Sequence, residues 1–532
     1  MKLNLLVSIA IISFAQLAFA QCTVEPWSLE KRIDLSDVVV EGRVISQECA
    51  WDAQNHNIYT IHEIEVYKSF KGKYKNNTTK LVTPGGVIGT EMLKVSPVLE
   101  LYTKDLGIFL LKKNAISIPG LSDAYQPTAS VQSYIKIDQR DYTAYDYIKS
   151  YHSIKFDLYN TIKSFTNEQF QHVKYYDVEG GKPGIEPTAK PTISSFSVDS
   201  VSSGTETKLT INGSNFGFAR GNGGVGFKDA NFGDGRYYYP PISKSYISWS
   251  NSKIEVIVPT RAGTGNVRVT NTGNETGTST KDLFVKWAHL NVLYPKAAND
   301  TNFYPTDHVN DNSAGGYTWQ MTSEFSLKTS AVAAFTRSLE EWRCETGMNW
   351  NIGTNSSVDA LASDNINIVR FTTFSDSKLG VCYSRYSGCF HSNGINWYVK
   401  ELDIEFDRGR SWYYETGSPS SFQYDFQSVT THELGHGHQL GHVRDNNIVM
   451  HYSLGNGQRK ANLVARDVEA GEYVTDKSVS SSPCGPGTMT AIAANACVLR
   501  APDGDFTVSD TVPCPTTNVV FTDQTEGDAS SY

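Results

Sequence analysis

The order of apolar and polar positions divides the chain into three stretches with different expected folds. In the first, residues 58–70 alternate apolar and polar side chains, and residues 106–111 form a short apolar run. Both patterns are typical of strands, and Pro84-Gly85-Gly86 supplies a turn. We therefore predict a β-rich domain at residues 21–175, whose last part, 140–175, is more helical.

A linker and a second set of strands follow. Residues 176–190 are dense in proline and glycine and nearly free of apolar residues, which is typical of a linker. From 191 to 286, short strand patterns recur at even spacing between glycine and proline turns, which predicts a β-sandwich. The main candidate strands are Pro191–Phe196, Leu209–Gly217, Ile247–Ile254 and Ala262–Val269.

The third stretch, residues 287–476, mixes helical and strand periodicity. Residues 329–347 place apolar side chains on one helical stripe and end at Gly347, a common C-terminal stop. We predict a mixed α/β domain large enough to bury its own core. The stripe consists of Val332, Phe335, Leu339 and Trp342, and the strand candidates are 366–371, 379–390 and 402–407. Residues 477–532 have few long apolar runs, and we assign this cysteine-containing tail no fold.

Length and composition agree with a multidomain protein. A chain of 532 residues corresponds to roughly three to four domains. Hydrophobic residues make up 39% and charged residues 19% of the chain, as in folded domains rather than disordered segments. The net charge of −9 and the lack of a basic tract argue against nucleic acid or an anionic membrane surface as a partner.

Residues 1–20 have the features of a secretory signal peptide. Lys2 provides the positive charge, residues 5–18 are almost wholly apolar, and Ala18-Phe19-Ala20 is a small-x-small cleavage site. A membrane anchor is the competing interpretation, but the apolar run is short for a membrane span. We predict cleavage after Ala20 and a secreted, extracellular protein without stable membrane insertion.

Eight cysteines in an exported chain favour disulfides over free thiols. Cys382 and Cys389 are expected to close a short loop, and Cys22 and Cys49 both lie in the first domain. None of the cysteines has the CxxC spacing of a zinc ribbon. The sequence assigns no partners to the remaining four, which are Cys344, Cys484, Cys497 and Cys514.

Residues 431–452, THELGHGHQLGHVRDNNIVMHY, contain five of the chain's twelve histidines. His432 and His436 are four residues apart, so on a helix they share one face and can bind one zinc ion. Glu433 is adjacent, where a carboxylate can take a proton from a zinc-activated water. His442 can complete the ligand set after a turn and leave one position open for water. These residues predict a hydrolase site with one catalytic zinc ion.

With Met450 eight residues after His442, this stretch resembles the metzincin zinc endopeptidases, and its layout is similar to the matrixins. The resemblance implies an α/β catalytic domain in which Met450 forms an apolar floor under the metal. It also implies that Glu433 is the general base and proton shuttle. The zinc ligands that it implies are His432, His436 and His442.

Two further stretches resemble known modules. LTINGSNFG at 209–217 and AGTGNVRV at 262–269 resemble the immunoglobulin-like IPT/TIG module, which implies a spacer or a surface- or matrix-binding role without chemistry of its own. In the first domain, SDVVVEGRV and YTIHEIEVYKSFKG after an N-terminal cysteine resemble a netrin-like or tissue-inhibitor-like barrel. The implied architecture is a β-rich, barrel-like N-terminal domain, a β-sandwich, and an α/β metzincin catalytic domain.

Two site assignments rest on the metzincin resemblance alone. The family pairs extended substrate with an edge strand through backbone hydrogen bonds, and an ordinary edge strand is the alternative explanation. The residues placed there are Gly380, Val381, Cys382 and Tyr383. Tyr452 follows Met450 as in the astacins, whose tyrosine binds zinc or stabilises the transition state; a tyrosine that merely packs on this turn explains the pattern equally well.

One residue departs from the family pattern. The glycine expected seven residues after the first motif histidine is Gln439, and glutamine in a left-handed conformation costs on the order of 1–2 kcal/mol. The flanking Gly437 and Gly441 offer displaced positions for the turn. His438 is a rival third ligand, but it points off the ligand face of a continuing helix, which favours a solvent-facing or supporting role. Asp425 is expected to cap that helix.

The sequence therefore predicts a secreted zinc-dependent endopeptidase that acts on protein or peptide substrates. The alternative is an adhesion or binding protein with a vestigial or structural metal site, although such a site needs no base like Glu433. Bound Ca²⁺ is compatible with a secreted metzincin, but the chain has no calcium-loop motif.

A further hypothesis concerns latency. Tissue inhibitors that the first domain resembles occupy a metzincin zinc through an N-terminal cysteine, and Cys22 would do the same here once Gln21 is removed. A Cys22–Cys49 disulfide explains the same residues more simply.

Overall fold

The computed structural model describes residues 24–74, 76–180, 189–233, 235–295, 301–391, 394–480, 486–492 and 497, and the backbone of 506–508 and 521–523. The predicted signal peptide and Cys22 lie outside the described residues. Within the described part, no helix combines the length and the apolar character that a membrane span requires.

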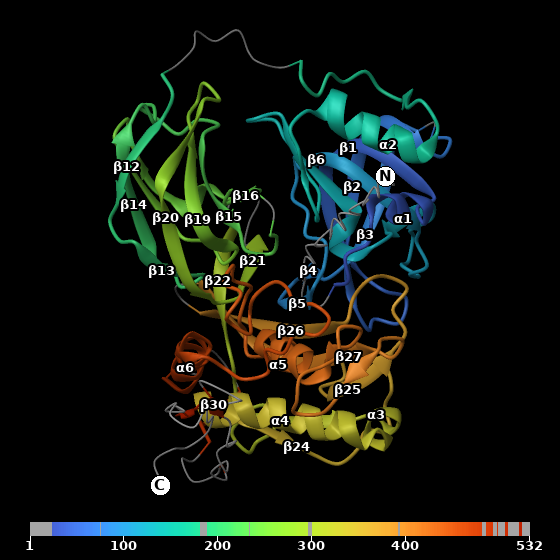
Figure 1. The fold of residues 1–532 in the computed structure, drawn as a ribbon, viewed down its shortest axis with the longest axis vertical. Helices are drawn as coiled ribbons and strands as arrows, with labels where there is room; N and C mark the ends of the chain where they lie inside the picture. Colours follow the sequence, from blue (N-terminus) through green and yellow to red (C-terminus); the bar gives the residue numbers. More distant parts are fainter. Residues whose placement is uncertain are drawn as a thin grey trace, which may run out of the picture.

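The N-terminal region, residues 24–180, is built around a strongly curved sheet (Figure 1). Its strand order is β1-β2-β3-β7-β6-β8-β9-β10, and β6 also pairs with β1, so the pairings among β1, β2, β3, β7 and β6 close on themselves. Val178 is buried in one of its two main apolar clusters, so the chain packs on this region beyond the predicted end at 175. The elements are α1 Leu29–Asp34, β1 Val38–Trp51, β2 Ile58–Lys71, β3 Thr78–Pro84, β4 Gly86–Ile88, β5 Glu91–Ser96, β6 Leu106–Lys113, β7 Ala124–Pro127, β8 Tyr134–Asp138, β9 Thr143–Tyr145, β10 Ser150–Tyr151, α2 Tyr159–Thr166 and β11 Gln171–His172.

The middle region, residues 189–288, is a sandwich of two sheets, as the strand spacing predicted. The sheet β12-β14-β18-β17 faces the sheet β13-β20-β19-β15-β16. Leu209, Ile254 and Val269 lie in the apolar core of this region. Its strands are β12 Thr192–Phe196, β13 Ser200–Ser203, β14 Lys208–Ser214, β15 Gly224–Asp229, β16 Tyr237–Tyr238, β17 Tyr246–Trp249, β18 Lys253–Ile257, β19 Ala262–Thr270 and β20 Thr276–Ala288.

The C-terminal region combines a mixed sheet with helices. Strands β24, β23, β25 and β27 run parallel, and β26 runs antiparallel beside β27. The predicted helix at 329–347 is confirmed as α4, which ends at a left-handed Gly347 (φ 71°). The elements are β21 Asn291–Pro295, β22 Thr301–Asp307, β23 Tyr317–Met321, α3 Ser323–Leu327, α4 Thr329–Thr346, β24 Trp350–Ile352, β25 Asn367–Thr372, β26 Gly380–His391, β27 Gly394–Asp407, β28 Trp412–Tyr413, β29 Tyr424–Asp425, α5 Phe426–Gly437, α6 Ala465–Ser480, β30 Phe506–Val508 and β31 Phe521–Asp523.

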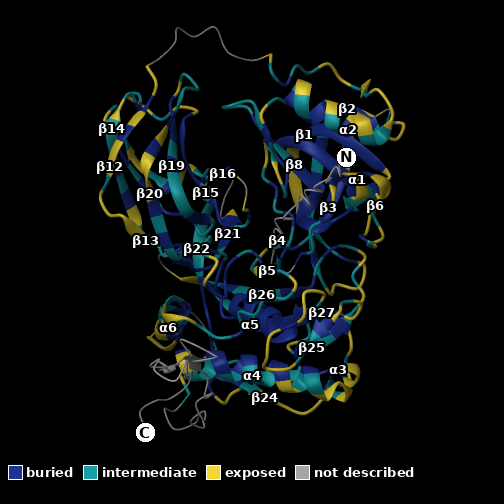
Figure 2. Cartoon of the chain, viewed as in Figure 1, coloured by how far each residue is buried: buried dark blue, intermediate teal, exposed yellow. Residues whose placement is uncertain are grey.

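The N-terminal and middle regions lie side by side against one end of the C-terminal region (Figure 1). The hairpin β4–β5 comes from the N-terminal region but continues the C-terminal sheet in the order β27-β26-β5-β4. Beneath this junction, every residue of α5 is buried, as the continuous dark helix in Figure 2 shows. The helix with the zinc-site motif therefore lies where all three regions meet.

Candidate metal centre

The helix α5 begins where the sequence predicted. Asp425 is its N-cap, and its carboxylate accepts hydrogen bonds from the backbone N–H (3.3 Å) and the hydroxyl (2.5 Å) of Ser428. Arg459 donates to the same carboxylate at 3.0 Å. A side-chain oxygen at this position satisfies an otherwise unpaired N–H of the first turn, which fixes the start of the helix and so the direction of its histidines.

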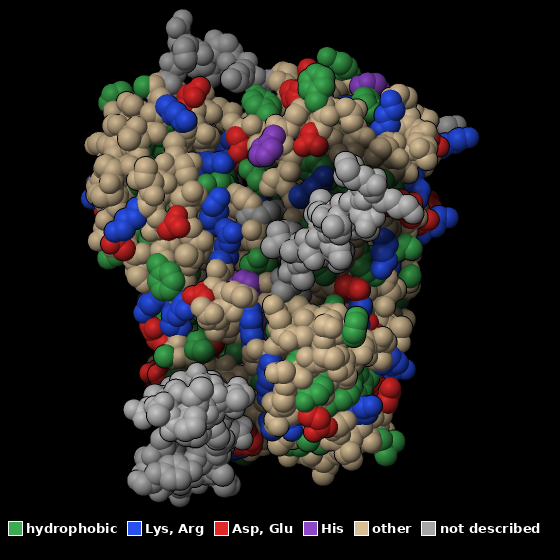
Figure 3. Space-filling model, in the orientation of Figure 1, with side chains coloured by type: hydrophobic (Ala, Val, Ile, Leu, Met, Phe, Trp, Pro, Cys, Tyr) green, Lys and Arg blue, Asp and Glu red, His purple; other side chains and the backbone are tan. Residues whose placement is uncertain are grey.

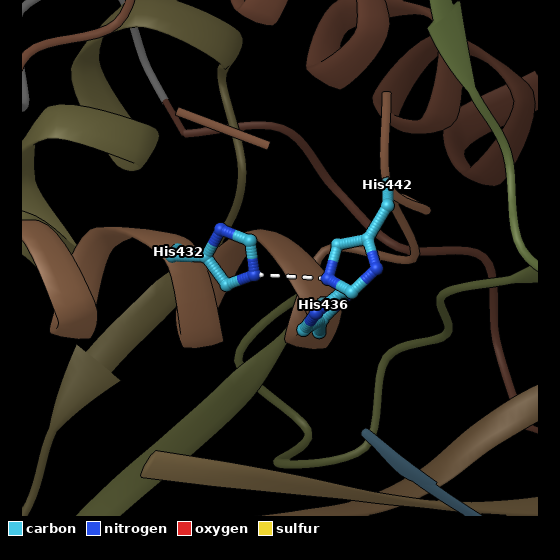
Figure 4. Close-up of side chains that lie close together, drawn as sticks. All are labelled: His432, His436 and His442. Atoms are coloured by element: carbon cyan, nitrogen blue, oxygen red, sulfur yellow. Dashed lines mark hydrogen bonds between the residues drawn. The ribbon is translucent and has the colours of Figure 1, made fainter. Parts of the chain in front are cut away.

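Three histidines converge beside α5 (Figure 4). His432 and His436 lie on one face of the helix, and His442 returns to them after the turn. The Nε2 atoms of His432 and His442 are 3.2 Å apart, and one ligand atom of each of the three lies within 4.8 Å of the others. Two ligands held at about 2.0–2.1 Å by a tetrahedral zinc stand about 3.3 Å apart. The donor set and its spacing therefore fit one zinc ion.

Each of these imidazoles is oriented by a contact of its Nδ1 atom. Nδ1–H donates to an oxygen in every case, which leaves the Nε2 lone pair directed at the common centre. The acceptors are the carbonyl oxygens of Val449 (2.8 Å, from His432) and Leu440 (2.9 Å, from His436) and the Oδ1 of Asn231 (3.0 Å, from His442).

Burial keeps the three ligands neutral. It lowers the pKa of His432 to about 4 and holds the pKa values of His436 and His442 well below the ordinary value. A neutral imidazole is the form that binds a metal, so little proton release opposes binding near neutral pH.

The turn after α5 is formed by Gln439 itself. This residue has a φ of 69°, whereas neither Gly437 nor Gly441 adopts a positive φ, so the displaced-glycine explanation is wrong. Its Oε1 accepts from Thr306 (2.9 Å) and Tyr386 (2.8 Å), and its Nε2 donates to the Gly437 carbonyl (2.9 Å). Three buried hydrogen bonds, each worth about 1 kcal/mol, offset the cost of the left-handed backbone.

His438 is a core residue, so the predicted solvent-facing role is wrong. Its side chain is fully buried, its Nε2 lies 3.0 Å from the hydroxyl of Thr346 in α4, and its ring packs against Trp342 and Trp350. The ring is thereby held in the apolar core of the C-terminal region. His438 is absent from the cluster formed by the three converging histidines.

Glu433 is a buried carboxylate beside the three histidines. Neither of its oxygens has a well-formed hydrogen bond to a described residue. Burial raises its pKa well above the ordinary value, although the nearby backbone N–H of Cys382 favours the charged form. Gly380 lies against it, since a Cβ added there would come within 3.0 Å of the Glu433 Cγ. An orphaned buried carboxylate at such a position indicates a missing polar partner.

Met450 and Tyr452 follow on the next turn. Met450 is buried, and its sulfur packs so closely on Gly435 of α5 that a Cβ there would lie 2.2 Å from it. The Tyr452 hydroxyl lies against Gly233 of the middle region, and its ring contacts that of His451 at a tilt of 48°. Met450 thus supports the helix next to His436.

Two polar residues from outside the C-terminal region contact two of the three histidines. Asn231 of the middle region contacts His442, and the Ser96 hydroxyl of the N-terminal region lies 3.0 Å from the Nε2 of His436. Neither residue was predicted from the sequence. No motif surrounds them, and they approach the site only through the packing of the three regions.

The expected substrate edge lies on β26, the last strand that the C-terminal region contributes to its sheet. Strand β5 pairs antiparallel with it, with Ser96 opposite Cys382 and Val95 opposite Tyr383. Gly380 and Val381 precede this ladder.

The predicted Cys382–Cys389 loop is wrong. Cys382 is free and buried, and Cys389 is disulfide-bonded elsewhere. The two lie seven residues apart on the extended strand β26, or about 23 Å, far beyond the reach of a disulfide. Cys49 is also free, which removes the Cys22–Cys49 explanation. Cys344 of α4 pairs with Cys497, with a Cα–Cα distance of 5.6 Å.

Two of the three regions match known protein families. Residues 313–474 match the matrixin family. Residues 191–285 match the IPT/TIG domain. Both matches confirm the resemblances that the sequence motifs carry. The matrixin domain contains α4, α5 and the three converging histidines, and the IPT/TIG domain contributes Asn231.

Other comparisons add little. No curated protein matches the chain. Among solved structures, a protein of unknown function from Bacteroides thetaiotaomicron VPI-5482 has a TM-score of 0.17 at 18% identity. An auxiliary nutrient binding protein from the same organism has a TM-score of 0.16 at 16% identity. Each match covers 20% of this chain and 24% of the other, and TM-scores this low assign no fold.

A matrixin domain implies zinc, and the three histidines supply the ligands that zinc takes. The other cluster of metal-ligand residue types in the described part of the chain is Glu340 with Cys344 and Cys497, and both cysteines are used in the disulfide. It lacks the set of oxygen ligands that Ca²⁺ needs, so no such cluster among the described residues supports the calcium prediction.

Proposed function

We propose that this protein is a secreted zinc-dependent endopeptidase. The observation that carries the proposal is the convergence of three imidazoles beside the buried carboxylate of Glu433. His432, His436 and His442 would hold the metal, and Met450 would support them from below. The matrixin match of the surrounding domain supports this assignment.

When bound, zinc polarises the peptide carbonyl and acidifies the attacking water. Glu433 accepts the proton of that water and passes it to the leaving amine. Burial raises the pKa of Glu433 in the metal-free site, whereas the charge of a nearby divalent cation favours the carboxylate form that accepts the proton. Asn231 keeps His442 in the correct tautomer.

The edge of β26 at Gly380–Tyr383 is the proposed binding strand for extended substrate, through backbone hydrogen bonds. Tyr452 is proposed to donate a hydrogen bond to the charge that develops on the carbonyl oxygen. The IPT/TIG domain is proposed to add a surface or matrix contact.

The test compares wild type with Glu433→Gln, each loaded with one equivalent of zinc. We expect both to bind zinc equally, as measured by elemental analysis, but only wild type to cleave denatured protein. Removal of zinc by a chelator should abolish cleavage, and added zinc should restore it. Equal cleavage by the two proteins would disprove the role of Glu433. A protein that binds zinc but never cleaves would favour the alternative, a binding protein with a structural metal site.

A further inference from the structure

The hairpin β4–β5 belongs to the N-terminal region in sequence but to the C-terminal sheet in space. Strand β5 pairs antiparallel with β26 from Ser387 to Cys382, and the backbone of Thr90 accepts a further hydrogen bond from Gly388 (2.7 Å). In Figure 1 the blue hairpin lies directly on the orange strand. Two of the four residues of the edge that we propose for substrate, Cys382 and Tyr383, are therefore already paired with a segment of the same chain.

Both faces of β5 are used in this contact. Leu93 and Val95 are buried with Val381 of β26 and with Ile58 of the N-terminal region in one apolar cluster. On the opposite face, Met92 packs against the core of the matrixin domain. Strand β5 is thus packed from both faces, fully at Leu93 and Val95 and partly at Met92.

The ladder ends at the metal centre. Ser96 is the last paired residue of β5, because Pro97 has no N–H to donate. Its hydroxyl oxygen lies 3.0 Å from the Nε2 of His436, the atom directed at the metal position. This distance matches the roughly 3.3 Å between two ligands of one tetrahedral zinc. The three histidines leave one such position open.

A chain of ion pairs links the hairpin to the IPT/TIG domain. Lys94 pairs with Glu100 at 2.8 Å, Glu100 pairs with Arg261 of the IPT/TIG domain at 3.1 Å, and Arg261 pairs with Asp229 at 2.5 Å. Figure 3 shows basic side chains along the seam between the two upper regions. Asp229 is two residues from Asn231, so the same network ends at the loop that orients His442.

We infer that β5 is an internal occupant of the substrate edge, and that the Ser96 hydroxyl fills the fourth ligand position of the zinc. The described structure is then the resting, self-blocked form of the proposed peptidase, on whose function this inference rests. All three histidine ligands come from the matrixin domain, so the hairpin can leave without dismantling the metal site. A free substrate strand would take its place on β26.

The ligand position is tested by spectroscopy of cobalt(II)-loaded Ser96→Cys, prepared without oxygen or reductant so that the Cys344–Cys497 disulfide stays closed. A sulfur at this position should produce an intense thiolate–cobalt charge-transfer band that wild type lacks. The matched control is Ser46→Cys, since Ser46 is an exposed serine of the same region that contacts Glu63. Absence of the new band in metal-loaded Ser96→Cys would overturn the role of Ser96.

The blocked edge is tested with acetohydroxamic acid, a small zinc-binding probe. Val95→Asp places a charge in the buried cluster under β5, whereas the control Thr78→Asp places one at the exposed first position of β3 in the same region. We expect Val95→Asp to bind the probe about tenfold more tightly or better, and Thr78→Asp to match wild type. Equal affinity in all three proteins would overturn the proposal.

A covalent lock guards against misfolding of Val95→Asp. Lys94 and Ser384 lie directly opposite each other, so Lys94→Cys with Ser384→Cys can form a cross-strand disulfide. We expect the oxidised lock to exclude the probe, and the reduced form, which lacks the Lys94–Glu100 pair, to bind it at least as tightly as wild type treated with the same reductant. A lock that admits the probe would also overturn the proposal.

These outcomes separate the two proposals. Tight probe binding without any peptide cleavage in Val95→Asp would leave the occupied edge intact and reject the peptidase. Equal cleavage and equal probe affinity in wild type and Val95→Asp would leave the peptidase intact and reject the occupied edge.

Discussion

At the residue scale, the third histidine depends on a side chain from another domain. Asn231 accepts the Nδ1–H of His442, so its loss frees the ring to rotate or change tautomer. We expect Asn231→Ala to weaken zinc binding about 10- to 100-fold and Asn231→Asp to retain most of the affinity, as measured by competition with a chelator. Asn212→Ala, which removes a surface contact to Ser195 in the same domain, is the control and should have no effect.

Gln439 offers a test of how a strained backbone is compensated. Gln439→Ala keeps the left-handed conformation but removes the acceptor of Thr306 and Tyr386, so we expect it to lower the free energy of unfolding by about 2–4 kcal/mol. Gln439→Gly loses the same bonds but relieves the backbone strain, so its loss should be smaller by about 1 kcal/mol. Urea denaturation of both variants measures the difference, and equal losses would show that the backbone is not strained.

The sequence predicts the local part of the site and misses the remote part. The spacing of His432, Glu433 and His436 is set by one helical turn, so it is readable from the motif. Ser96 and Asn231 are separated from their histidine partners by 340 and 211 residues, respectively. Nothing in their neighbourhoods marks them, because their position follows from domain packing alone.

At the element scale, the stability of α5 should depend on its N-cap, Asp425. Asp425→Ala removes the cap and leaves Arg459 without its carboxylate, so we expect a loss of about 1–2 kcal/mol in stability. Asp425→Asn retains a capping oxygen and should lose less. Thermal unfolding of the zinc-free protein measures both, and a neutral Asp425→Ala would mean that tertiary packing alone sets the start of the helix.

Element types were predictable where periodicity is strong. The stripe of α4 and the alternation in β27 each correspond to an element in the structure. The alternation does not reveal that the polar side of β27 is also buried. On that side Asp403 accepts a hydrogen bond from the Ile368 N–H, and Glu405 pairs with Arg370. Those partners lie on other strands, so a single-strand pattern carries no information about them.

At the scale of the whole molecule, the contact between the N-terminal region and the IPT/TIG domain should weaken in acid. Burial alone would raise the pKa of Glu100, but Lys94 and Arg261 outweigh it and lower the pKa to about 2. A depressed pKa stabilises the folded form above the ordinary value of 4.5 and loses that effect as the pH falls from 4.5 toward 2.

Glu100→Gln isolates this contribution. We expect wild type to be more stable than Glu100→Gln by roughly 2–3 kcal/mol at pH 7, and this difference to vanish between pH 4.5 and 2. Urea denaturation of the zinc-free proteins at several pH values measures it. A difference that does not change with pH would contradict the ion-pair explanation.

The modular organisation was predictable for the matrixin and IPT/TIG segments, because their motifs are dense and local. The netrin-like resemblance of the N-terminal region stays a prediction. Latency through Cys22 also stays a prediction, because Cys22 lies outside the described residues. The residue of the N-terminal region that contacts a histidine of the metal centre is Ser96. No single-chain pattern predicts that β5 leaves its own sheet, since its apolar residues would suit either sheet equally.

The attachment of β5 to the rest of the chain also sets how it competes. A segment tethered on both sides is present at its site at an effective concentration in the millimolar range, whatever the dilution of the protein. A substrate at micromolar concentration would meet few open sites. Its apparent dissociation constant would equal the intrinsic constant divided by the fraction of molecules whose site is open. A partner that pulls the hairpin aside would relieve this competition reversibly. Cleavage of both tethers would release the strand to dilute away, and activation would then run in one direction only.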